Sequence, residues 1–176
     1  MDVERFVFID ESAVNDSMAR QRGRCPQGRR LVESIPAGLW RTSTLVAGIR
    51  LDGVVAPMVF DGPLNGESFA QYVESSLVGE LNAGDVVIMD NLPVHKSRRV
   101  ADAITAAGCI LVFLPPYSPD LNPIEPMGSK VKSLLRKAAA RTSEAVVVAT
   151  GDALRAITTE DCDGYFGHCG YDALPS

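Results

Sequence analysis

Three carboxylates stand out in this sequence, because each follows a segment that could hold it in a fixed place. Asp10 and Asp90 each come directly after a run of four apolar residues, and Glu125 follows the proline-rich stretch 115–124. Carboxylate oxygens are hard ligands that suit Mg²⁺, and a pair of bound divalent ions can drive phosphodiester chemistry. The set predicts a two-metal site if the fold brings the three residues together.

Each carboxylate also has an ordinary structural explanation. Asp10 could end a strand and begin a turn, and Asp90 with Asn91 could form a turn by bonding its own backbone. Asn122 and Glu125 have the spacing of a helix capping box, in which the glutamate reaches back to the backbone of the capping residue. A glutamate held in that way could not also point at a metal, so the two interpretations of Glu125 exclude each other.

The elements that must position these residues follow from the apolar periodicity and the turn residues. Strands are predicted at 6–10, 41–51, 54–60, 86–89 and 109–114, the second and third joined by a hairpin at Asp52-Gly53. Helices are predicted at 68–81, 97–107, from Pro123 onward after an Asn122 cap, and at 143–157. Residues 11–30 are predicted to form a loop, and the tail has little pattern.

This order predicts an α/β fold, a mixed sheet with helices on its faces, built as one domain over residues 1–176. Asp10 and Asp90 fall at the C-terminal ends of their predicted strands. In open α/β sheets this is the edge at which ligands bind.

Composition limits the class of protein. Hydrophobic residues make up 46% and charged residues 22%, no apolar run reaches the roughly 20 residues of a membrane helix, and no secretory signal is evident. The four cysteines are too few and too irregular for a disulfide framework. We therefore expect a cytoplasmic protein without a membrane partner.

The net charge of −5 argues against a free-standing, high-affinity DNA binder, because such affinity comes largely from Lys and Arg. The basic residues nevertheless gather in three clusters, two of them just after Asp90 and Glu125. The clusters are Arg20, Arg22, Arg24, Arg29 and Arg30; Lys96, Arg98 and Arg99; and Lys130, Lys132, Arg136, Lys137 and Arg141. Each could be a solvated face, but together they favour a phosphate-bearing substrate.

Three motifs carry a resemblance to a known family. They are Phe-Ile-Asp-Glu-Ser at 8–12, Met-Asp-Asn-Leu-Pro-Val-His-Lys-Ser at 89–97 and Leu-Pro-Pro-Tyr-Ser-Pro-Asp-Leu-Asn-Pro-Ile-Glu at 114–125. Thirty-four residues separate Asp90 from Glu125, the spacing typical of that family. The chain resembles the catalytic domain of DDE transposases, in the bacterial insertion-sequence branch of the mariner superfamily.

The resemblance implies an RNase H-like fold, with a mixed five-stranded sheet and helices on both faces. It implies that Asp10, Asp90 and Glu125 are the catalytic residues and the ligands of two Mg²⁺ ions, with Mn²⁺ as a substitute. One ion would activate the attacking water or 3′-OH and the other would stabilise the leaving oxygen. The implied reaction is cleavage at transposon ends and transfer to target DNA, by a chain that can act as a homodimer.

Two departures from the family stand out. Full-length members carry an N-terminal helix-turn-helix that recognises the terminal repeats; here we expect it to come from a separate upstream reading frame. Gly128 stands where relatives have a large aromatic residue, which predicts a looser helix around Glu125. Two other functions therefore stay open: a catalytically silent remnant that acts as an oligomerisation or regulatory partner, and another RNase H-like nuclease.

Three further sets of residues have two interpretations each. His95 is either a neighbour of the metal ligands or of phosphate, or else a surface or capping histidine. Cys162, His168 and Cys169 could suggest zinc, although ordinary packing explains them better because no fourth ligand is clear. Lys130, Lys137 and Arg141 either contact DNA phosphates or form a solvated face.

Overall fold

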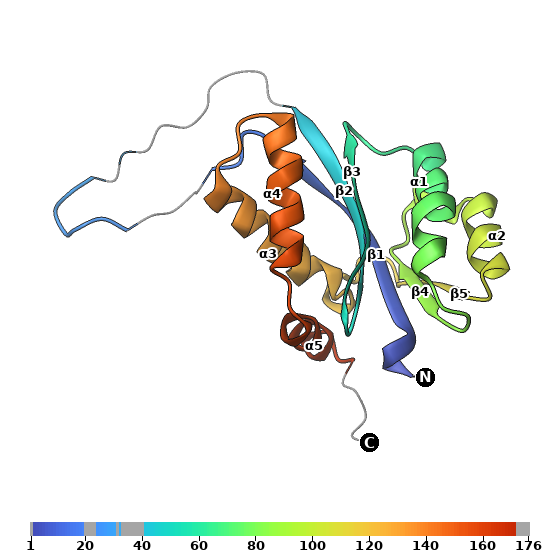
Figure 1. Ribbon diagram of the computed structural model, residues 1–176. Coiled ribbons are helices and arrows are strands. Elements are labelled where there is room, and N and C mark those ends of the chain that lie inside the picture. The colour runs from blue at the N-terminus through green and yellow to red at the C-terminus, as the bar shows by residue number, and fades with distance from the viewer. Residues whose placement is uncertain (1, 20–23, 31, 33–40, 172–176) are drawn as a thin grey trace.

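The computed structural model describes residues 2–19, 24–30, 32 and 41–171. One five-stranded sheet runs through this part of the chain, in the spatial order β3-β2-β1-β4-β5 (Figure 1). The strands are β1 (Phe6–Asn15), β2 (Thr42–Arg50), β3 (Gly53–Asp61), β4 (Val86–Met89) and β5 (Ile110–Phe113). Antiparallel pairs join β1, β2 and β3, whereas β4 is parallel to both β1 and β5. The predicted mixed sheet is confirmed.

Helices cover both faces of the sheet (Figure 1). On one face lie α1 (Gly66–Tyr72), its continuation through a π turn η2 (Val73–Leu77) and a 3-10 turn η3 (Val78–Glu80), and α2 (Arg98–Ala106). On the other lie α3 (Ile124–Ala138), α4 (Ser143–Arg155) and α5 (Thr159–His168). The short 3-10 helices are η1 (Val3–Arg5), η4 (Pro93–Lys96) and η5 (Pro119–Leu121). None of the helices in the described ranges combines the length and the apolar character needed to cross a bilayer.

Strand β1 contributes side chains to two separate hydrophobic cores, one on each face of the sheet, because successive side chains of a strand point to opposite sides. Phe6 and Phe8 pack with Phe166 beneath α3–α5, whereas Val7 and Ile9 pack with Phe69 beneath α1 and α2. The same alternation continues beyond the core. It sends Asp10 toward the α3 side and Glu11 toward the α1 side.

Strand β1 is longer than the sequence pattern predicts. The predicted loop at 11–30 is wrong for residues 11–15, because β1 runs on to Asn15 as the antiparallel partner of β2; residues 16–19 and 24–30 form neither helix nor strand. Its parallel pairing with β4, however, stops at Ile9. Asp10 therefore lies at the point where β1 loses one neighbour, and not at the end of the strand.

Two other predictions need correction. The apolar run at 109–114 indicates a buried strand, but β5 lies at the edge of the sheet, and Ile110 and Val112 are 57% and 37% exposed. In Figure 1, α3–α5 lie over the part of the sheet away from β5. The tail contains the unpredicted helix α5, which begins with a capping box between Thr158 and Asp161. That capping pattern was readable in the sequence.

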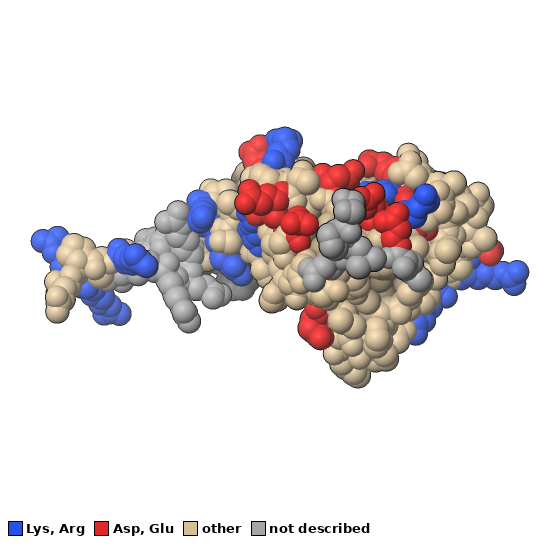
Figure 2. Space-filling model, turned by 90° about the horizontal axis from the view of Figure 1, so that it is seen from below, with Lys and Arg blue, Asp and Glu red and all other residues tan. Residues whose placement is uncertain are grey.

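The net negative charge is spread unevenly over the surface. Figure 2 shows Asp and Glu side chains gathered on the face that is seen from below, with Lys and Arg mainly around its periphery. Arg24, Arg29 and Arg30 are exposed in the segment 24–30, which lies away from the sheet in Figure 1. Arg20 and Arg22, from the same predicted basic cluster, lie outside the described residues.

Candidate active site

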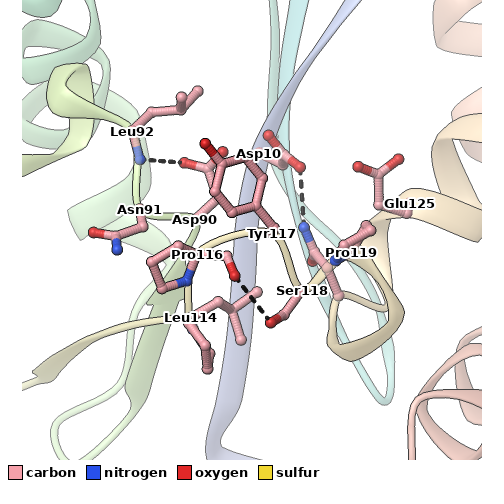
Figure 3. A pocket seen from close by; sticks show the side chains of 12 residues that line it. Asp10, Asp90, Asn91, Leu92, Leu114, Pro116, Tyr117, Ser118, Pro119 and Glu125 are labelled. Carbon is pink, nitrogen blue, oxygen red and sulfur yellow. Dashed lines mark hydrogen bonds between the residues drawn. The ribbon is translucent and has the colours of Figure 1, made fainter.

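Asp10, Asp90 and Glu125 line one open pocket of about 460 Å³. Asp10 comes from β1, Asp90 from the residue after β4, and Glu125 from the first turn of α3. The loop 114–119 and Asn122 supply much of the remaining wall. Figure 3 shows Asp10 between the other two carboxylates, so three segments far apart in the sequence bring their acidic groups to one place.

Both oxygens of Asp10 accept hydrogen bonds. The backbone N–H of Glu11 donates to Oδ1 (2.7 Å), and the side-chain amide of Asn122 donates to Oδ2 (3.0 Å). Burial raises the pKa of Asp10 to about 7 despite the Glu11 bond, and the negative charges of Asp90, Glu11 and Glu125 add to this effect. Asp10 is thus held in place, in surroundings that disfavour its charge.

Asp90 is oriented by its own loop. Its Oδ1 accepts a hydrogen bond from the backbone N–H of Leu92 (3.0 Å), which is the local turn contact considered above. The same oxygen lies 2.6 Å from Nδ1 of His95. Asp90 can therefore form the local turn and also belong to the site, because the turn fixes one carboxylate oxygen while the side chain lines the pocket.

The capping interpretation of Glu125 is wrong. Helix α3 begins at Ile124, and the Asn122 N–H that a capping glutamate would reach donates instead to the Pro119 carbonyl (3.1 Å). Asn122 uses both ends of its side-chain amide: Nδ2 donates to Asp10, and Oδ1 accepts from the backbone N–H of Ile124 (3.4 Å) at the start of the helix. The exposed Glu125 side chain lines the pocket (Figure 3).

His95 links the pocket to a fourth carboxylate. Its ring is fully buried, packs 4.5 Å from the ring of Phe69, and places Nε2 2.9 Å from Oε2 of Glu11. Burial opposes a charge on His95, but the hydrogen bond and charge of Glu11, together with Asp90, outweigh it and raise the pKa of the imidazole. The surface and capping interpretations of His95 are wrong.

Glu11 is a residue whose part in this arrangement was missed. The clue was its place next to Asp10 in a strand, because alternation sends the two side chains to opposite faces. Asp10 meets Asn122 on the α3 side, and Glu11 meets His95 on the α1 side.

The donor set fits a hard divalent cation. Three carboxylates line the pocket, and no Lys or Arg is among its described lining residues. Within the described ranges no three His, Cys, Asp or Glu side chains are close enough to hold one ion together. In Figure 3 Asp10 lies between Asp90 and Glu125, so divalent ions bound here would find carboxylate oxygens on this side of the pocket.

The residues considered for DNA contact or for zinc binding make contacts within the protein. Lys130 forms an ion pair with Asp161 of α5, and Arg141 donates to the backbone carbonyl of Met18. Cys162 and Cys169 are buried as free thiols. Lys130 and Arg141 thus join separate segments of the chain, and the two cysteines pack in the core.

A family model, described as DDE superfamily endonuclease, matches residues 5–147. The chain belongs to this family. The match spans β1 through the first part of α4 and so contains all three pocket carboxylates. No curated protein matches this DDE superfamily chain in sequence.

Solved structures of Mos1 mariner transposase share its fold. The paired-end complex with Mg has a TM-score of 0.72 and is 18% identical, covering 96% of this chain and 52% of the Mos1 chain. The strand transfer complex has a TM-score of 0.69 at 17% identity, covering 96% and 51%. The isolated Mos1 catalytic domain has a TM-score of 0.61 at 16% identity, covering 96% and 76%. The fold is RNase H-like, and this DDE superfamily chain spans about half the length of the Mos1 chains in the two complexes.

Proposed function

We propose that this DDE superfamily chain is the catalytic domain of an insertion-sequence transposase from the bacterial branch of the mariner superfamily. It would cut DNA at the transposon ends and join those ends to target DNA. The observation that carries the proposal is the convergence of Asp10, Asp90 and Glu125 on one pocket from three separate elements. The 34-residue spacing and the proline-rich motif before Glu125 support the same assignment.

Asp10, Asp90 and Glu125 are the residues that we propose would hold two Mg²⁺ ions, or Mn²⁺ in their place. Such ions, when bound, activate an oxygen nucleophile and stabilise the leaving oxygen. Asn122 holds Asp10, and His95 with the Leu92 N–H holds Asp90. The protein thereby keeps two of the three carboxylates oriented before DNA arrives.

The partners that we propose follow from the same assignment. Mos1 has been solved with paired transposon ends and in a strand transfer complex, so DNA ends and target DNA are the proposed substrates here. We propose that two copies of the catalytic domain act on paired ends. A helix-turn-helix from an upstream reading frame would recognise the terminal repeats, and the complex would work in the cytoplasm.

The test is cleavage of DNA that carries the element's terminal repeats, in Mg²⁺ or Mn²⁺, by this chain alone and joined to the upstream helix-turn-helix. We expect nicking and joining, and loss of both in Asp90→Asn. Asp102→Asn is the matched control, because Asp102 is exposed on α2 and forms an ion pair with the exposed Arg98. Cleavage that survives Asp90→Asn would overturn the proposal. Failure of both wild-type forms to cut DNA or bind metal would favour a silent remnant, and a preference for RNA–DNA hybrids would favour another RNase H-like nuclease.

A further inference from the structure

Tyr117 is a fully exposed aromatic residue at the mouth of the carboxylate pocket. Its relative exposure is 101%, and it is the one aromatic residue among the large exposed hydrophobic side chains of the described segments. It belongs to the pocket wall, and Figure 3 shows its ring in front of the space between Asp90 and Asp10. A large apolar ring left in water at this position is not explained by packing.

The contrast with two of the other tyrosines strengthens this point. Tyr72 is buried and donates its hydroxyl to the Ala56 carbonyl (2.8 Å), and Tyr171 donates to the Leu121 carbonyl (2.9 Å). Neither type of contact is present for Tyr117 within the described residues. As far as the described segments extend, its ring and hydroxyl are therefore available to a partner outside the protein.

The backbone holds Tyr117 in this exposed place at a cost. Its φ is +59°, a left-handed conformation that a non-glycine residue adopts only when its surroundings impose it. Pro115, Pro116 and Pro119 surround it, and each fixes its own φ near −65°. The loop is thus a stiff support that presents the ring at the pocket mouth.

If a DNA phosphate lies at the carboxylates, the base of the neighbouring nucleotide must lie close to the entrance of the pocket, where Tyr117 is. Aromatic rings bind unpaired bases by stacking, without regard to their sequence, because every base has a π face. A base inside a duplex already has neighbours on both faces, so only an unpaired base could use the ring. Leu92, which is 48% exposed, is another exposed apolar side chain in the pocket wall.

We propose that Tyr117 stacks on an unpaired nucleobase beside the phosphate that is cut, and so positions the DNA strand in the pocket. The inference rests on the proposed function. Tyr117 is a substrate-binding residue in this scheme and takes no part in proton transfer. Its contribution should therefore be to DNA binding.

The test uses the full chain and terminal-repeat DNA with a single abasic nucleotide placed at successive positions around the cleaved bond. For wild type, KM should rise about 5- to 150-fold at one position, the range for loss of one stacked base. Tyr117→Ala should raise KM by a similar factor on intact DNA, with kcat little changed, and should be insensitive to the abasic nucleotide at that position. Tyr117→Phe should behave as wild type, because the ring is kept.

A fluorescence measurement makes the inference testable without cleavage. With 2-aminopurine placed at each position around the bond in turn, its fluorescence at one position should be quenched by wild type and Tyr117→Phe, and not by Tyr117→Ala. Tyr117→Gly keeps the positive φ without strain, so it should fold at least as well as wild type and still fail to quench. Val148→Ala, which removes an exposed apolar side chain on α4, is the matched control and should change neither result.

Three results would overturn the inference: Tyr117→Ala that binds and cuts as wild type, Tyr117→Phe as weak as Tyr117→Ala, or no abasic position whose effect disappears in Tyr117→Ala. If Tyr117→Phe were as weak as Tyr117→Ala, the hydroxyl and not the ring would contact the DNA. If no abasic position behaved in this way, Tyr117 would not stack on a base. A failure of the proposed function looks different, since it shows as cleavage that survives Asp90→Asn.

Discussion

At the scale of single residues, the site depends on contacts that join its two sides. His95 connects Glu11 on β1 to Asp90 after β4, and its ring is packed against Phe69 of α1. Groups that orient a metal ligand commonly change metal affinity or activity 10- to 100-fold when removed. The Glu11–His95–Asp90 arrangement is therefore expected to act through Asp90.

Replacing His95 by Phe should keep a ring against Phe69 while removing both contacts to carboxylates. We expect the Mg²⁺ concentration that gives half-maximal cleavage to rise about 10- to 100-fold, because Asp90 loses its orientation. Glu11→Gln keeps an acceptor for His95 and should have a smaller effect. If folded His95→Phe needed no more Mg²⁺ than wild type, His95 would be a packing residue only.

Asp10 should make stability depend on pH in metal-free protein. Its pKa is about 7 in the folded protein against an ordinary 3.8, so the folded state keeps the proton that the unfolded chain loses. Stability should fall as pH rises between about 4 and 7 and stay lower above that range. Asp10→Asn removes this penalty.

The measurement is thermal melting in EDTA. At pH 8 we expect Asp10→Asn to melt above wild type by at least the ~2–4 °C that about 1 kcal/mol produces in a protein of this size. Below about pH 3 the difference should disappear, since Asp10 is then protonated in both states. Glu125→Gln, at an exposed position, is the comparison and should change little. Equal melting of Asp10→Asn and wild type at pH 8 would contradict the expected burial of charge.

At the scale of elements, α3 is the helix that carries Glu125. At two positions of α3 and its C-terminal cap, the residue type does not suit the backbone conformation. Gly128 lies inside the helix, where a Cβ would meet only Ser12 Oγ at 3.7 Å, an ordinary contact distance. Ala139 follows the helix with φ +52°, a left-handed conformation that suits glycine. The predicted looseness of this helix stays a prediction, although α3 runs without a break from Ile124 to Ala138.

Two opposite substitutions should therefore both stabilise α3. Gly128→Ala should add about 1 kcal/mol, because alanine loses less backbone freedom in a helix. Ala139→Gly should add up to about 1 kcal/mol by relieving the left-handed strain. Urea denaturation measures both.

Ala138→Gly is the matched control for the second change. It places the same residue one position earlier, inside the helix, where it should lower stability. The explanation fails if Ala138→Gly and Ala139→Gly shift the denaturation midpoint in the same direction.

At the scale of the whole molecule, a buried ion pair ties the sheet together across β1. Arg50 at the end of β2 donates from Nη2 to Oδ2 of Asp85, just before β4, at 2.7 Å, and also to the Glu80 carbonyl. Both side chains are almost entirely buried. Removal of one partner from such a pair leaves an uncompensated buried charge.

Arg50→Ala should therefore lower the free energy of unfolding by about 3–5 kcal/mol. Arg99→Ala is the control, because Arg99 pairs with Glu74 at a similar distance but both side chains are partly exposed. That change should cost no more than about 1 kcal/mol. Similar losses in the two variants, measured by urea denaturation, would show that burial does not decide the strength of these pairs.

Much of the fold was predictable because its causes are local. Apolar runs, the Asp52-Gly53 hairpin and the helical spacing after Ser68 mark strands, turns and helices within a few residues, and the five-stranded mixed sheet is confirmed. The errors lie where a distant partner decides. β1 continues past Asp10 because β2 pairs with it, and β5 is half-exposed because it lies at the sheet edge.

The sequence by itself determined the order of elements, the identity of the three carboxylates and the family to which their motifs point, since all of these are written in neighbouring residues. Only the tertiary structure decided how those carboxylates are held. Asn122 at the start of α3 donates its side-chain amide to Asp10, and His95 lies between Glu11 and Asp90, although its position in the sequence is 84 places from that of Glu11. Contacts of this range depend on how the sheet and its helices pack, and no local pattern of residues encodes them.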